Sequence, residues 1–153
     1  MKMLFSGVTL ALVLFVVQQA AYGDLPEHKK NESPNVTAGR KAIEAKDFKS
    51  AVGHLTKAIQ ENSKDADAHS MLGFTYRKLG TFDKSMEHYQ TALKLEPNHR
   101  TAREYLGELY LDMNQLPNAE KELAALKKAC PWFGKCEEYD DLKEAIEKFK
   151  GKK

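Results

Sequence analysis

The chain has 153 residues, of which 42% are hydrophobic and 30% are charged, and its formal net charge is +2 at pH 7. This composition is typical of one small globular domain and excludes a chain that is disordered throughout. The balanced charge also argues against nucleic-acid binding, which needs a clustered basic face. The only basic run, at residues 148–153, is interpreted as a solvated tail.

Residues 1–23 have the layout of a secretory signal peptide. An uncharged stretch, LFSGVTLALVLFVV at residues 4–17, is followed by Ala21 and Gly23 as a small-residue cleavage site before Asp24. Cleavage is predicted after Gly23, which would place the mature protein in the periplasm or outside the cell, with no stable membrane insertion. The apolar stretch is shorter than the roughly 20 residues that a spanning helix needs, which favours a cleaved signal peptide; an uncleaved anchor is the alternative.

Residues 24–32 are polar and predict a flexible lead-in, after which the sequence repeats with a period of 34 residues. The period defines three units, at about 33–65, 66–99 and 100–131. Glycine recurs at Gly39, Gly73 and Gly107. Small or apolar residues recur at Ala38, Leu72 and Leu106, at Ala42, Tyr76 and Tyr110, at Phe48, Phe82 and Leu116, at Ala51, Ser85 and Ala119, at Leu55, Tyr89 and Leu123, and at Ala58, Ala92 and Leu126.

Each unit is predicted to form two helices. Ser33 and Pro34 supply a cap and a first helical residue for unit one, while Asp65 and Asn98 are the cap candidates of the next two units. Because one helix pair cannot bury its apolar face alone, the three units are expected to stack around a continuous core.

The turn inside each unit is predicted at Lys46, Gly80 and Asn114. Glycine and asparagine tolerate the left-handed conformation that ends a helix, whereas Lys46 is a poorer fit. The second helix of unit three is expected to start near Pro117.

The repeat resembles the tetratricopeptide repeat. Unit two carries the resemblance through Leu72-Gly73, Tyr76, Phe82, Ala92 and Pro97, and unit three matches nearly as well. Unit one departs from the pattern at Asn35, Ala38 and Ala42, as a terminal repeat is expected to do. The resemblance implies an all-α fold, a right-handed α-solenoid of three helix–turn–helix repeats with a C-terminal capping helix.

The segment 132–153 is predicted to hold a cysteine loop, the capping helix and the basic tail. An apolar stripe with helical spacing is formed by Tyr139, Leu142, Ile146 and Phe149. The stretch CPWFGKC, just before this stripe, is where the period of 34 residues slips.

Cys130 and Cys136 are the only cysteines of the chain. A structural zinc site needs four ligands, and a thioredoxin-like site needs a C-x-x-C motif, so neither fits. Pro131 and Gly134 interrupt the helix between the cysteines and allow the two Cα atoms to approach within the roughly 7 Å that a disulfide needs. A structural disulfide is predicted; an exchangeable or catalytic disulfide and a Cu(I) site remain alternatives.

Trp132 and Phe133 lie inside the ring that this disulfide would close. We expect one of them to pack under the capping helix; the alternative is an exposed aromatic anchor for a partner.

No catalytic constellation or glycine-rich phosphate loop occurs in the sequence, so no enzymatic activity and no cofactor are predicted. His54 and His88 lie one repeat apart, and they are interpreted as two solvated histidines rather than as ligands of a shared metal.

The resemblance implies that the first helices of the repeats line a concave groove that binds an extended or helical peptide. Alignment with the family gives the groove residues as Val36, Arg40, Ile43, Glu44, Ser70, Phe74, Arg77, Lys78, Glu104, Glu108, Leu111 and Asp112. The middle of this groove is expected to be basic and its C-terminal end acidic.

The predicted function is a non-enzymatic protein–protein interaction module, an adaptor, scaffold or assembly factor that binds a protein or peptide partner in the groove. The alternative is an envelope thiol-redox or copper-handling protein that uses Cys130 and Cys136.

Overall fold

The computed structural model describes residues 32–152, and this part of the chain is all α-helical. The predicted signal peptide and nearly all of the predicted lead-in lie outside the described residues. The helices are α1 (Pro34–Glu44), α2 (Phe48–Glu61), α3 (Ala66–Lys78), α4 (Phe82–Leu95), α5 (Arg100–Asp112), α6 (Leu116–Ala129) and α7 (Glu137–Lys150).

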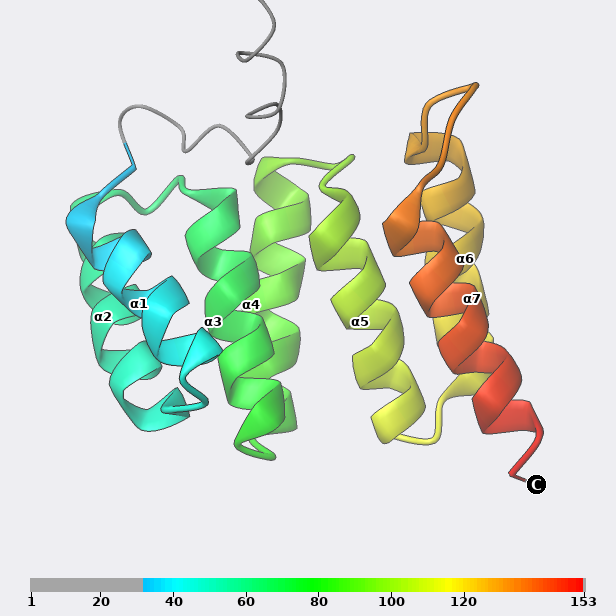
Figure 1. Cartoon of the computed structure of the whole chain (residues 1–153), viewed down its shortest axis with the longest axis horizontal. Coiled ribbons are helices and arrows are strands. Elements are labelled where there is room, and N and C mark those ends of the chain that lie inside the picture. The colour runs from blue at the N-terminus through cyan, green and yellow to red at the C-terminus, as the bar shows by residue number, and fades with distance from the viewer. Residues whose placement is uncertain (1–31, 153) are drawn as a thin grey trace, which may run out of the picture. The chain divides into compact units, whose positions relative to one another are not determined.

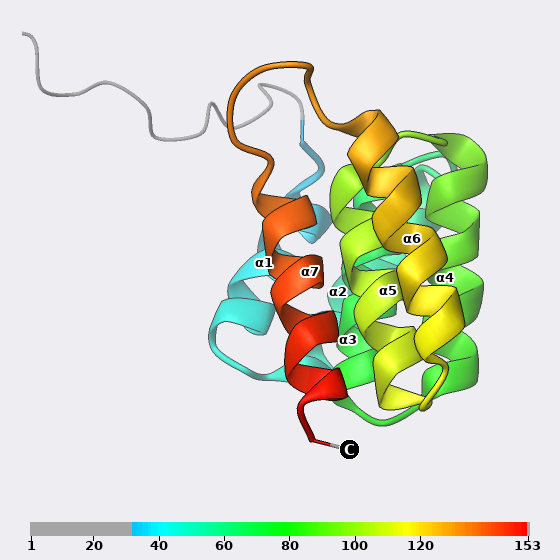
Figure 2. The same ribbon diagram turned by 90° about the vertical axis from the view of Figure 1, so that its right-hand side faces the viewer.

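The helices pair in sequence order and stack side by side in two layers (Figure 1). The pairs are α1 with α2, α3 with α4, and α5 with α6, and α7 packs against both helices of the last pair. Seen from the end of the stack, α1 and α7 lie on one side and α4 and α6 on the other (Figure 2). The expected solenoid of three helix pairs and a capping helix is confirmed.

The first two predicted helix caps are confirmed. The Ser33 side chain accepts a hydrogen bond from the backbone N–H of Asn35, with Pro34 as the first helical residue. The Asp65 carboxylate accepts one from the backbone N–H of Ala68 at 2.9 Å. Each bond satisfies a donor that the first turn of a helix leaves without a partner.

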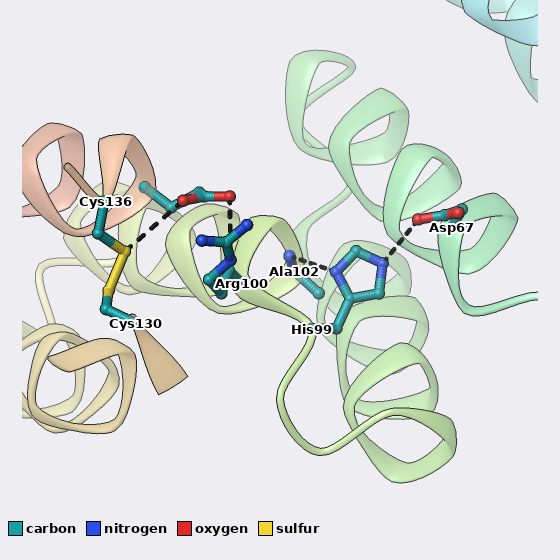
Figure 3. Close-up of polar contacts among 7 residues, drawn as sticks. Asp67, His99, Arg100, Ala102, Cys130 and Cys136 are labelled. Atoms are coloured by element: carbon teal, nitrogen blue, oxygen red, sulfur yellow. Dashed lines mark hydrogen bonds and ion pairs between the residues drawn. A yellow bond between two sulfur atoms is a disulfide. The ribbon is translucent and has the colours of Figure 1, made fainter. Parts of the chain in front are cut away.

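The third predicted cap, Asn98, is wrong, because His99 takes this position at the start of α5 (Figure 3). One imidazole nitrogen, Nδ1, accepts from the backbone N–H of Ala102 at 3.3 Å, and the other, Nε2, lies 3.1 Å from Oδ1 of Asp67. A histidine can both accept and donate, so this cap also connects α5 to α3.

All three predicted turn residues have the left-handed backbone conformation. Lys46 and Asn114 both have φ 59°, and Gly80 has φ 73°. The turn geometry is therefore the same in each unit, even at Lys46, where a side chain is present.

The three aligned glycines are points of close contact between helices. A methyl group at Gly39, Gly73 or Gly107 would lie 2.6, 2.8 or 2.5 Å from the side chain of Leu55, Tyr89 or Leu142, respectively. In the first two units the contacting side chain comes from the second helix of the same pair. In the third unit it comes from α7, although the repeat alignment places Leu123 at the position equivalent to Leu55 and Tyr89.

The capping helix α7 buries its apolar stripe on the last helix pair. Leu142 and Ile146 are fully buried and form one cluster with Ala119 and Leu126 of α6. Tyr139 and Phe149 pack at the edge of the same cluster. This packing covers apolar surface that the last repeat would otherwise expose to water.

The loop between α6 and α7 is closed by its two cysteines. Cys130 follows the end of α6 and Cys136 precedes α7, their Cα atoms are 5.8 Å apart, and their sulfur atoms are bonded in the structure. The expectation that Trp132 or Phe133 packs under α7 is wrong, since their side chains are 97% and 83% exposed. The underside of α7 is already occupied by its own apolar stripe, which packs against α6.

Alanine substitutions at two glycines test the helix contacts. Gly73→Ala should lower the free energy of unfolding by about 1–3 kcal/mol, because its methyl group would overlap the buried ring of Tyr89. Gly53→Ala on α2 is the matched control: no atom lies within 4 Å of its added methyl, so the better helix former should raise stability by roughly 0.5–1 kcal/mol. Urea denaturation followed by circular dichroism measures both; a stable Gly73→Ala protein would contradict the contact.

Candidate functional site

The predicted groove residues all lie on α1, α3 and α5, but they differ widely in exposure. Val36, Ser70, Glu104 and Leu111 are buried; Arg40, Ile43, Phe74, Arg77 and Glu108 are half-buried; Glu44, Lys78 and Asp112 are exposed. The buried members contribute to packing between helices. The surface that a partner can reach is therefore smaller than the alignment predicts.

Arg77 connects α3 to α5 through two ion pairs. Its guanidinium contacts the carboxylate of Glu108, and Nε donates to Oδ2 of Asp112 at 2.6 Å. The Arg77 side chain is only 11% exposed, so water screens these pairs weakly. The basic middle and the acidic end of the groove are thus not separate patches, because Arg77 is neutralised by two of the acidic residues.

Glu104 lies on α5, one turn before Glu108, and it is buried. The pKa of its carboxyl is raised to about 8, chiefly by burial and then by the nearby carboxylates of Glu108, Asp141 and Glu138, while Arg77 opposes the shift. The side chain is therefore mostly protonated and uncharged near neutral pH. The expected acidic end of the groove consequently carries less negative charge than the sequence indicates.

Phe74 sits in an aromatic cluster between neighbouring units. Its ring centroid is 5.0 Å from that of Tyr105 and 6.5 Å from that of Phe48, and the Lys78 ammonium lies 5.0 Å above the ring. Phe74 thus helps to hold α3 against α5, and Lys78 covers part of the apolar surface of its ring.

A pocket of about 230 Å³ opens where α3, α5 and α7 meet. It is lined by Arg77, Glu108, Leu111, Asp112, Ala145, Lys148, Phe149 and Lys152. The arginine and its two carboxylates form one side, α7 and the residues after it bring two lysines, and the remaining lining is apolar. A segment that combines an apolar side chain with a charged or polar group matches this lining.

Sequence reasoning found half of this pocket and missed the half that α7 contributes. The predicted groove included Arg77, Glu108, Leu111 and Asp112, but Lys148 and Lys152 were interpreted as part of a solvated tail. The contribution of α7 could have been predicted, because a capping helix packed on the last pair adds its own residues to the face formed by α1, α3 and α5.

The interpretation of His88 as a solvated histidine is wrong. His88 is half-buried, and its Nδ1 lies 3.0 Å from Nδ1 of His69 on the neighbouring helix, while His69 Nε2 lies 3.3 Å from the carbonyl oxygen of Ser63. Burial, followed by the proximity of His69, lowers the pKa of His88. The structure therefore pairs His88 with His69 and not with His54.

Residues 32–152 contain neither a metal-binding cluster nor a helix that could span a membrane. No group of three or more histidine, cysteine, aspartate or glutamate side chains in this range is arranged to hold a metal ion. No helix in the same range is long and apolar enough to cross a bilayer.

Comparison with known proteins finds similarity to a family model and to curated sequences. The model of the tetratricopeptide repeat matches residues 66–99. Superkiller protein 3 of Schizosaccharomyces pombe is 26% identical over 110 residues, which is 72% of this chain and 8% of that protein. Tetratricopeptide repeat protein 37 of Xenopus laevis is 27% identical over 112 residues, 67% of this chain and 7% of that protein. The chain therefore spans less than a tenth of either relative.

Solved structures with similar folds come from several proteins. The TPR2B domain of yeast Sti1, in a complex with pHsp70, has a TM-score of 0.71 at 17% identity, over 78% of this chain and 95% of that one. The type III secretion chaperone SycD of Yersinia enterocolitica, in complex with a peptide of the translocator YopD, has a TM-score of 0.68 at 14% identity, over 77% of this chain and 91% of that one.

The buried carboxyl of Glu104 predicts a pH-dependent stability. Because the folded-state pKa of about 8 lies above the value of 4.5 for a free glutamate, the folded protein holds a proton that the unfolded chain has released. This contribution is fully present below pH 4.5 and is lost as the pH rises toward 8. Glu104→Gln should therefore match the wild type at acidic pH and exceed its stability at alkaline pH.

Urea denaturation across that pH range measures the difference. Glu44→Gln, at an exposed glutamate of α1, is the control, and its free energy of unfolding should not diverge from that of the wild type as the pH rises. If the free energies of unfolding of the wild type and Glu104→Gln changed in parallel with pH, Glu104 would be ionised in the folded protein and the prediction would be wrong.

Proposed function

This chain is a tetratricopeptide repeat protein, and we propose that it is a non-enzymatic protein–protein interaction module that binds a partner polypeptide on the layer of α1, α3, α5 and α7. Its role would be that of an adaptor, scaffold or assembly factor. Fold alone does not assign function, so the proposal depends on the pocket at the C-terminal end of this layer.

The lining of the pocket supports a peptide ligand of mixed character. Leu111, Ala145 and Phe149 can cover an apolar side chain, and Lys148 and Lys152 can contact a carboxylate beside it. Lys148 already pairs with Glu144 on α7, but this pair is exposed to water and a ligand carboxylate can compete for it. Arg77 is already paired with two carboxylates, so it forms part of the pocket lining but offers little positive charge to a ligand. The preferred partner segment therefore carries an apolar residue next to an acidic one.

Similar structures support a polypeptide partner in general terms. The Sti1 domain and SycD are both described in complexes with other polypeptides. Both are less than 20% identical to this chain, so their particular partners are not transferred to it.

The compartment that we propose is the periplasm or the cell exterior, reached by way of a signal peptide cleaved after Gly23. The pattern of residues 1–23 supports export, and the bonded sulfur atoms of Cys130 and Cys136 fit an oxidising compartment. The alternative function in thiol-redox or copper chemistry requires these cysteines as accessible thiolates. Cys136 is buried and paired with Cys130, which favours a structural disulfide.

Peptide selection tests the proposed binding surface. A displayed library of random peptides is selected against the protein, and the selected peptides are measured by fluorescence anisotropy. We expect sequences with adjacent apolar and acidic residues, whose affinity falls about tenfold or more in a Lys148→Glu and Lys152→Glu double variant, since two favourable charge interactions become repulsive.

The matched control is the double variant Lys57→Glu and Lys143→Glu, which makes the same charge change at exposed positions that do not line the pocket. Equal loss of affinity in both double variants would mean that net charge, and not the pocket, determines binding. Peptides that cross-link to α2, α4 or α6 would contradict the proposed surface.

Intact mass tests the proposed compartment and disulfide. Protein from its native host should begin at Asp24, and a thiol-alkylating reagent should add mass only after reduction. A chain that retains residues 1–23, or one that is alkylated at two cysteines without reduction, would contradict the proposed export or the proposed disulfide, respectively.

A further inference from the structure

The loop between α6 and α7 holds the two most exposed large apolar side chains of the described residues. Trp132 and Phe133 are adjacent, and they are far more exposed than Leu79, the next such residue at 47%. Figure 1 shows the loop projecting beyond the ends of both helices. Contact of this apolar surface with water is unfavourable, and burying it against another apolar surface would lower the free energy.

The base of the loop is held rigidly. The disulfide joins its two ends, and Glu138, just after Cys136, lies 3.7 Å from the Cys136 sulfur and 3.5 Å from Arg100 at the start of α5 (Figure 3). Gly134, with φ +100°, turns the chain back toward Cys136. The two ends of the loop are therefore fixed in position, which lowers the conformational entropy that the loop loses when a partner buries the rings.

The shape of the loop indicates what can cover these rings. Two aromatic side chains bury roughly 400 Å² together, about half of what each partner contributes to a standard protein–protein interface. The surrounding residues offer no apolar rim that would extend the contact, because they are charged: Lys127, Lys128, Lys135, Glu137 and Asp140 are exposed. A lipid bilayer needs no complementary shape, and tryptophan is enriched at its interface with water.

We propose that Trp132 and Phe133 insert into the interfacial region of a lipid bilayer and attach the protein reversibly to a membrane surface. This surface is separate from the peptide-binding layer, so both can be occupied at once. The inference adds a peripheral contact and leaves the helices outside the bilayer, in agreement with the lack of a spanning helix in residues 32–152.

Two features of the loop limit the depth and the lipid preference of this contact. Residues 131–135 form no backbone–backbone hydrogen bonds in the described chain, so their peptide groups must stay at the level of the hydrated headgroups. The three lysines near the loop are balanced by Glu137, Glu138 and Asp140, so attraction to anionic lipids is weak. Binding should therefore depend on the aromatic rings and respond little to salt.

Trp132 is the only tryptophan of the chain, so its fluorescence reports on this loop whatever the rest of the protein does. On addition of phosphatidylcholine vesicles, its emission should shift to shorter wavelength, and lipids brominated near the headgroup should quench it more than lipids brominated near the chain end. Vesicles that also contain phosphatidylglycerol should give a similar midpoint of the titration at low and at high salt.

Two variants that keep Trp132 separate the loop from other contacts. Phe133→Ser should shift the vesicle titration about tenfold toward higher lipid concentration, because one buried aromatic side chain is lost. Leu79→Ser, at the exposed leucine outside the loop, is the matched control and should leave the titration unchanged.

The proposal is overturned if the emission of Trp132 does not respond to vesicles, or if Phe133→Ser and the wild type give the same titration. It is equally overturned if the response requires anionic lipid, which would indicate attraction by charge alone. An emission shift that depends on protein concentration without vesicles would show that a second copy of the chain covers the rings instead.

Discussion

Close contact between helices at three glycines is the constraint on which the rest of the structure depends. Gly39 and Gly73 bring the two helices of a unit together around Leu55 and Tyr89, and Gly107 admits Leu142 of α7. These contacts determine how far apart neighbouring helices lie, and therefore where the side chains of α3, α5 and α7 meet. The pocket lies where α7 packs against α5, and Gly107 is one of the contacts between these two helices.

The helices, their turns and the stacking order could be predicted from the sequence, because they follow from local patterns that recur three times. Lys46 shows how strongly the repeat constrains the chain, since it adopts the left-handed turn conformation without being glycine or asparagine. The features that could not be predicted are contacts between units. Arg77 finds Glu108 and Asp112 on another helix, and α7 fills the glycine contact that the alignment would give to Leu123.

Charge in the candidate site is largely cancelled within the protein itself. Arg77 is held by two carboxylates, and Glu104 keeps its proton near neutral pH because burial disfavours the ionised form. A count of charged residues therefore overestimates the field that a partner experiences. The lysines at the rim, Lys148 and Lys152, keep more of their charge: Lys148 pairs with Glu144 at 2.5 Å, but both side chains are well exposed, so water weakens this pair and a ligand can compete for the ammonium.

The contact between Gly107 and Leu142 also has a consequence for how such a chain could lengthen during evolution. The interior unit meets a neighbour on both sides, so a tandem duplication of residues 66–99 would leave the contact of α7 with the last pair intact. The new junction would still lose one contact between units, because Lys78 of the second copy would lie opposite Arg77, where Asp112 lies now. A unit inserted after residue 131 would instead displace α7 and leave Leu142 and Ile146 without their partners on the last pair. Growth of the array is therefore favoured from its interior and opposed at its capped end.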